Sequence, residues 1–175
     1  MTINLKENMR IWKEVRVTDP AHTKGVTRGR KFTAIDAMYQ VQRATEVFGP
    51  VGIGWGYDVD YCFHIENLPA PMVPHVVANV TVWHGDRANR FGPVMAIHPL
   101  VAKYSSGAQF DDDAPKKALT DALTKALSHL GFSADVFLGK YDDNKYVEKA
   151  REYTERERTR KLSEYRKEEP NEGSE

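Results

Sequence analysis

The stretch from Asp111 to Tyr146 constrains the fold most, because its first half is a clearly delimited helix. Asp113 predicts the N-cap, and Pro115 falls in the first turn, where a missing N–H costs nothing. Gly131 predicts the end of the helix. The apolar residues between these signals recur at helical spacing: Ala118, Leu119, Ala122, Leu123, Ala126, Leu127 and Leu130. This pattern predicts a helix that lays one wide apolar face on a core.

The opposite face of the same helix is polar. It carries Lys117, Asp121, Thr124, Lys125 and Ser128, with Lys116 at its border. Such a stripe can hold a phosphate chain, because ammonium groups attract it and hydroxyls donate to its oxygens. The alternative is a solvated face in which Lys117 and Lys125 each pair with Asp121 at a spacing of four residues.

Three strands are expected before this helix. Residues 55–65, 75–84 and the run from Arg90 to Ala102 show strand patterning, with a turn around Gly85-Asp86 and a bulge or edge at Gly92-Pro93. Residues 4–16 predict a short helix, and Thr33 is expected to cap a second helix that ends at Phe48. The order favours an α+β fold in which an antiparallel β-β-β-α core packs its sheet on the long helix.

Two motifs in this order resemble the single-strand annealing superfamily. They are KKALTDALTKALSHLGFSADVFLGKYDDNKY in the long helix and YQVQRATEVFGPVGIGW from Tyr39 to Trp55. The superfamily includes the eukaryotic radiation-sensitivity recombination mediator and, as related proteins, Erf and Red-beta; the phage members are the most similar. The resemblance covers residues 25–147. It implies a ring-like or helical homo-oligomer that anneals complementary single strands of DNA in homologous recombination and DNA repair.

The resemblance also implies where DNA is held. Lys125 aligns with a basic DNA-contacting position, Thr124 stands where relatives carry a second basic residue, and Lys116 corresponds to a family lysine. The remaining candidates are Lys117 on the same stripe, Lys103 and Tyr104 before the helix, Arg28, Arg30 and Lys31 as the other wall of a groove, and Arg43. The basic segment from His22 to Asp36 is expected to be a loop, whose glycines let the backbone approach a ligand. A solvated connecting loop is the alternative.

Composition narrows the cellular setting. The 175 residues carry 25 basic and 25 acidic side chains, so a DNA site must be a local patch. Residues 1–43 hold 9 basic and 4 acidic residues, so this segment is where we most expect such a patch. The single cysteine, Cys62, fits a reducing compartment. With no secretory signal and no apolar run of membrane-spanning length, we expect a cytoplasmic protein, in a bacterial host if it is phage-encoded.

We expect one annealing domain over residues 1–147 and a charged helical or disordered tail over residues 148–175. The tail has the pattern of a solvated helix, so it should be dispensable for annealing. A host single-strand binding protein or a companion exonuclease is its candidate partner.

No catalytic constellation is visible, and we expect neither enzymatic activity nor a cofactor. The histidines lack metal-ligand spacing, and no nucleophile elbow is present. The alternative function is a metal-dependent nuclease, or another small-substrate enzyme, built on the acidic triplet Asp111–Asp113. Acids before a helix are otherwise caps. A module that binds double-stranded RNA or DNA is a third possibility for the same order of sheet and helix.

Overall fold

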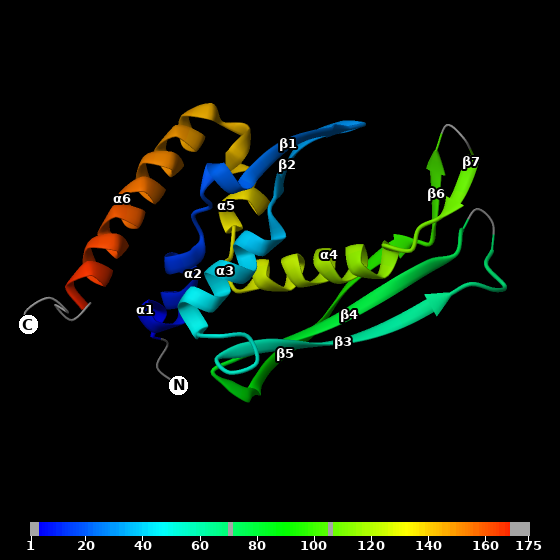
Figure 1. Cartoon of the computed structure of the whole chain (residues 1–175), viewed down its shortest axis with the longest axis horizontal. Helices are drawn as coiled ribbons and strands as arrows, with labels where there is room; N and C mark the ends of the chain where they lie inside the picture. Colours follow the sequence, from blue (N-terminus) through cyan, green and yellow to red (C-terminus); the bar gives the residue numbers. More distant parts are fainter. Residues whose placement is uncertain (1–3, 70–71, 105–106, 169–175) are drawn as a thin grey trace, which may run out of the picture.

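The structure, a computed structural model, describes residues 4–69, 72–104 and 107–168 (Figure 1). Its centre is a three-stranded antiparallel sheet in the order β3-β4-β5. These strands are β3 (Trp55–His64), β4 (His75–His84) and β5 (Asp86–Pro99), and helix α4 (Ala114–His129) lies across one face of them. The α+β architecture expected from the sequence is therefore confirmed.

Small residues on α4 let the helix approach the sheet closely. The central strand β4 buries Val76, Ala78, Val80 and Val82 against the helix, and α4 buries Ala118, Ala122, Ala126 and Leu127 in return. Each fully buried valine or leucine contributes roughly 1.5–3 kcal/mol relative to an exposed one. The helical periodicity of the sequence thus produces the main core of the protein.

Strand register sets which side chains face the helix. Tyr57 pairs with Val82, and Phe63 pairs with Val76, so the aromatic face of β3 points to the α4 side of the sheet. Phe63 nevertheless remains 52% exposed. The expected irregularity at Gly92-Pro93 is confirmed, because the β4–β5 register shifts between Val80 and Val82, opposite this dipeptide.

The N-terminal region differs from the sequence prediction in two places. Within the segment expected to be a loop, residues 23–35 form a hairpin, and its turn is at Gly29, whose φ of 70° suits glycine. The helix after it begins later than expected, because Thr33 lies within a strand of the hairpin. Asp36 caps that helix instead, with Oδ1 accepting the Met38 N–H at 2.9 Å. Met38, in the first turn of that helix, is 67% exposed. The elements are α1 (Leu5–Asn8), α2 (Arg10–Val15), η1 (Pro20–His22), β1 (Thr23–Arg28), β2 (Arg30–Ile35) and α3 (Ala37–Phe48).

A second small hairpin precedes α4, where only a connection was expected. Its strands are β6 (Val101–Tyr104) and β7 (Gly107–Phe110). After α4 the chain forms α5 (Ala134–Phe137), η2 (Lys140–Asp142) and α6 (Asn144–Glu168). Helix α6 begins four residues before the predicted start of the tail and buries Ala150. Among the helices that the structure describes, none is long and apolar enough to cross a membrane.

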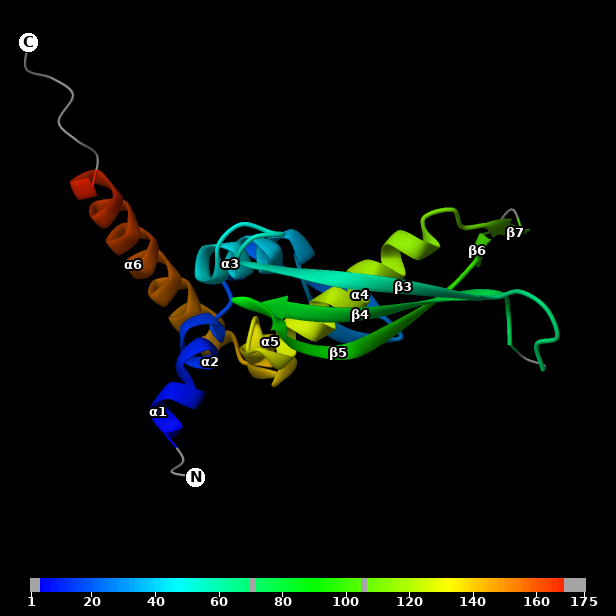
Figure 2. The same ribbon diagram turned by 90° about the horizontal axis from the view of Figure 1, so that it is seen from below.

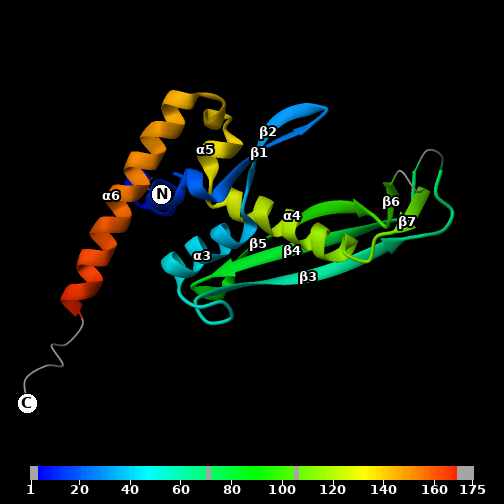
Figure 3. The same cartoon turned by 45° about the horizontal axis from the view of Figure 1, so that its top comes forward.

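The two hairpins and the sheet lie on opposite sides of α4. Figures 1 and 3 show β1–β2 and β6–β7 rising on the side of the helix that faces away from β3–β5. Figure 2, seen from the sheet side, shows α6 running away from the sheet at the end opposite β6–β7. The outward face of α4 therefore shares one side of the molecule with both hairpins.

Candidate nucleic-acid interface

The outward face of α4 presents part of the polar stripe expected from the sequence, but Ser128 is buried and its hydroxyl donates to the Lys125 carbonyl at 2.7 Å. Lys116 and Lys125 are exposed there, and Thr124 is partly buried. Asp121 does not pair with Lys125, because its carboxylate contacts Nε2 of His98 on β5 at 2.8 Å. The ion pair of Asp121 with Lys125 is therefore not formed, although the exposure of Lys116 and Lys125 still fits a solvated face. Lys125 keeps its charge available for another partner.

Two residues of the acidic triplet before α4, Asp111 and Asp113, contact lysines of the same helix. Both carboxylate oxygens of Asp111 accept hydrogen bonds from Lys117 Nζ, at 2.8 and 2.7 Å. This hydrogen bond, against a smaller opposing effect of desolvation, lowers the pKa of Asp111 below its ordinary value. Asp113 is the N-cap residue, as predicted from the sequence, but its side chain makes no cap hydrogen bond. Its carboxylate lies 3.7 Å from Lys116 Nζ instead.

These contacts bear on the metal-dependent alternative. Magnesium is held by carboxylate oxygens, and those of Asp111 are occupied by an ammonium group. Within residues 4–69, 72–104 and 107–168, no group of three or more His, Cys, Asp or Glu side chains is placed to hold a metal ion. The triplet serves here to position lysines on the first turns of α4.

Lys125 lies against an aromatic side chain that the sequence analysis did not single out. Its Nζ is 5.1 Å from the centroid of the Phe137 ring, a cation–π distance, and Phe137 is 45% exposed. The chain returns this ring to α4 through a sharp turn at Gly131, whose φ is 104°. A Cβ at Gly131 would approach the Trp12 Cα to 2.8 Å, so only glycine fits. Residues 131–137 thereby place an exposed ring beside the predicted DNA-contacting lysine.

A cleft of about 300 Å³ lies between β2 and the α5–η2 segment. Lys31 and Phe32 line it from β2, and Phe137, Tyr141 and Asp142 line it from the other side. Phe137 lines this cleft and also contacts Lys125. The cleft that Lys31 lines therefore lies next to the ring that Lys125 contacts.

The remaining candidates of the two hairpins are placed only by their backbones. Arg28 and Arg30 flank the turn between β1 and β2, and Lys103 and Tyr104 end β6. The side chains of these four residues lie outside the part of the chain that the structure describes. Their strands nevertheless stand on the side of α4 that faces away from β3–β5 (Figure 3).

A buried polar network fixes α5, which carries Phe137. Asp135 is 2% exposed and accepts hydrogen bonds from the Thr18 N–H at 2.9 Å, the Thr18 hydroxyl at 2.6 Å and the Tyr146 hydroxyl at 3.0 Å. The Tyr141 hydroxyl donates to the Thr18 carbonyl at 2.6 Å. Burial, followed by the charge of Asp135, raises the pKa values of both tyrosines above their ordinary range, so both hydroxyls stay protonated donors. The acidic residue inside the run FSADVFLG was the only sequence signal for this network.

Arg43 belongs to a different surface. Its side chain is 17% exposed and contacts the Glu46 carboxylate and the Glu14 carbonyl, so its partners lie on α3 and α2 rather than on α4. Lys161 of α6 also reaches Glu46, at 2.6 Å. Burial raises the pKa of Glu46, but the hydrogen bond from Lys161 and the charge of Arg43 outweigh it and lower that pKa overall. The structure does not bring Arg43 to the stripe of α4.

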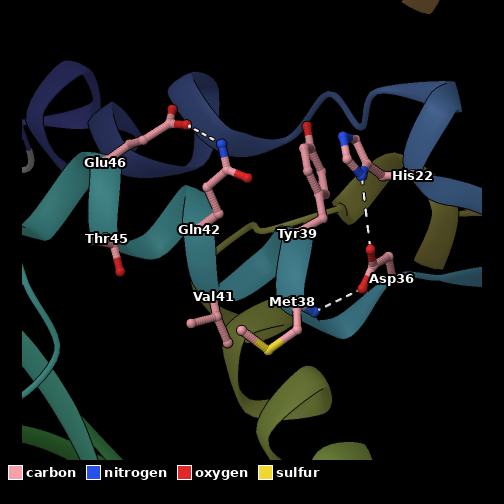
Figure 4. Close-up of a pocket in the computed structure, with 8 residues that line it drawn as sticks. All are labelled: His22, Asp36, Met38, Tyr39, Val41, Gln42, Thr45 and Glu46. Atoms are coloured by element: carbon pink, nitrogen blue, oxygen red, sulfur yellow. Dashed lines mark hydrogen bonds and ion pairs between the residues drawn. The ribbon is translucent and has the colours of Figure 1, made fainter.

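A cleft of about 450 Å³ beside α3 is unsuited to phosphate (Figure 4). His22 stacks on Tyr39 there, with ring centroids 4.5 Å apart, and the carboxylates of Asp36 and Glu46 line the same cleft. Two carboxylates repel a polyanion, and the aromatic pair already stacks on itself. The cleft between β2 and α5–η2, by contrast, combines the half-exposed Phe137 ring with Lys31.

Comparison with protein-family models gives no match for this chain, and a search of the curated proteins returns no significant match. A function for it must therefore be inferred from its own residues and from the two motifs of its sequence.

Proposed function

We propose that this protein binds single-stranded DNA along the outward face of α4 and anneals complementary strands as a homo-oligomer. The observation that supports this most directly is the position of Lys125. Its ammonium group is exposed, has no carboxylate partner among the described residues, and lies 5.1 Å from the centroid of an exposed aromatic ring. Cations next to accessible rings are what sequence-independent single-strand binding requires.

The proposed activity needs binding at this site but no catalysis. Annealing makes and breaks no covalent bond, so the protein must hold the phosphate backbone while the bases remain able to pair. Lys125 contacts the Phe137 ring, Lys31 lines the cleft that this ring also lines, and Lys116 extends the stripe. The hairpins that carry Arg28, Arg30, Lys103 and Tyr104 stand on this side of α4. Contacts from these elements can follow a strand across the molecule.

Assembly into a ring or helical oligomer would compensate for the weak binding of each subunit. The chain has zero formal net charge, so a single copy offers only a small basic patch. A strand passing over several copies repeats the same contacts, and linked weak contacts multiply in affinity. The sheet has two open edges, β3 and β5, and β3 carries the half-exposed Phe63. Such edges favour pairing between subunits.

The test measures single-strand binding and annealing in EDTA for the parent protein, Lys125→Ala and the control Lys149→Ala. Lys149 is an exposed lysine on α6, remote in sequence from the stripe. We expect Lys125→Ala to weaken binding to mixed sequences equally and to reduce the salt slope by about 0.7 for each phosphate that the variant no longer neutralises. Lys149→Ala should behave as the parent does.

Three results would contradict the proposal. The first is parental binding by Lys125→Ala across a salt series, and the second is strand cleavage on addition of Mg²⁺, which would favour the nuclease alternative. The third is a strict monomer in light scattering at micromolar concentration, with and without DNA, which would remove the oligomeric part.

A further inference from the structure

We infer that the cleft between β2 and α5–η2 is a subsite for one unstacked nucleobase, with Phe137 as its stacking platform. This inference rests on the proposed function and adds a contact to the base, whereas the lysines of α4 were expected to contact phosphate only. It makes Phe137 a binding residue in its own right rather than a support for Lys125.

The ring is available to a ligand. Phe137 ends the short helix α5 and is 45% exposed, although it is a large apolar side chain next to the core. It contacts the Lys125 ammonium group and also lines the cleft. The Asp135 network holds α5 against Thr18, so the ring is carried on a fixed backbone. A preorganised aromatic surface loses little entropy when a base stacks on it.

The size of the cleft suits a single planar ring system. Its volume of about 300 Å³ is at the lower end of the roughly 300–1,000 Å³ typical of small-ligand pockets. Phe32, 39% exposed, and Tyr141 add aromatic surface on either side. A base pair inside a duplex cannot enter such a cleft without leaving its stack. The subsite therefore favours single strands over duplexes.

Charge decides how a nucleotide would lie. Asp142 lines the cleft, and its carboxylate repels phosphate but can accept a hydrogen bond from a ring or exocyclic N–H of a base. Lys31 lines the cleft and Lys125 lies over the Phe137 ring, so each can attract a phosphate that flanks the base. The base points into the cleft and the backbone stays outside. Because every base has a π face, sequence preference should be weak.

The test compares ordinary single strands with abasic strands that carry the same number of phosphates. Phe137→Leu should weaken binding of ordinary strands about 5- to 150-fold, the effect expected for one stacked base per subunit. It should leave binding of abasic strands unchanged. Phe137→Tyr should restore binding of ordinary strands, and Tyr165→Leu, which removes an exposed aromatic of α6, should match the parent. Circular dichroism and oligomer size confirm that each variant is folded.

The outcomes separate the two proposals. Lys125→Ala should lower binding of both kinds of strand, because it removes a cation that attracts phosphate. If Phe137→Leu lowers both kinds equally, the ring only positions Lys125 and the base subsite is wrong. If Phe137→Leu binds ordinary strands as the parent does, the cleft is not used. Failure of the parent protein to bind any single strand would overturn the proposed function itself, together with the subsite.

Discussion

Replacement of Asp135 by asparagine tests the network that fixes α5 beneath the proposed site. In the native protein, Oδ2 accepts from the Thr18 N–H and the Tyr146 hydroxyl, and Oδ1 accepts from the Thr18 hydroxyl and the Val136 N–H. Asparagine keeps the shape but has one oxygen and one NH₂ group. In either orientation of the amide, its NH₂ group faces a backbone N–H, that of Thr18 or that of Val136. One donor is therefore left without an acceptor.

The loss of stability in Asp135→Asn follows from this geometry. A buried donor without a partner costs about 1–3 kcal/mol. The remaining hydrogen bonds also weaken, because those to an ionised acceptor are roughly twice as strong as neutral ones. We expect Asp135→Asn to lower the free energy of unfolding by about 3 kcal/mol. With a slope of about 2 kcal/mol/M, the urea midpoint should fall by about 1.5 M.

The assay is urea unfolding at a fixed protein concentration, followed by far-UV circular dichroism, because an oligomer's stability depends on concentration. The control is Asp60→Asn, an exposed acid on β3, which should change the free energy by less than about 0.5 kcal/mol. An Asp135→Asn midpoint equal to that of the parent, with an unchanged slope, would show that these hydrogen bonds do not hold α5.

Three further predictions concern stability and the tail. Because the pKa of Tyr146 is raised in the folded state, its contribution to stability is complete below the unfolded pKa of about 10 and is lost as the pH rises beyond it. Urea midpoints measured from pH 8 to about 11 should therefore fall less steeply for Tyr146→Phe than for the parent or the exposed control Tyr165→Phe; equal slopes would contradict this. Gly131→Ala should lower the free energy of unfolding by well over about 1 kcal/mol, because φ is 104° at this position and the added Cβ would meet Trp12. An unchanged urea midpoint for this variant would argue for a different turn. Truncation after Val147 should preserve annealing, and a folded, oligomeric truncation that fails to anneal would refute the tail's dispensability.

The sequence predicted the parts of the site that depend on local pattern. Lys125 could be placed on the outward face of a helix because the alanines and leucines around it recur every three or four residues. The predicted start of the second helix was wrong because two residues competed for its N-cap. Thr33 and Asp36 are both acceptable caps, and only the pairing of β1 with β2, which places Thr33 opposite Gly25, decides between them.

The sequence by itself thus determined the α+β order, the apolar face of α4 and the lysines opposite that face, because each depends on neighbours within a turn or a strand. Only the tertiary structure brought Phe137 to Lys125 and into the cleft that Lys31 lines, and Asp135 to Thr18, which is 117 residues away in the chain. The physical reason is that a side chain's periodicity fixes the face on which it lies, whereas its partner depends on the path of the intervening chain. A carboxyl group can then be buried in an apolar run only because that path supplies its donors.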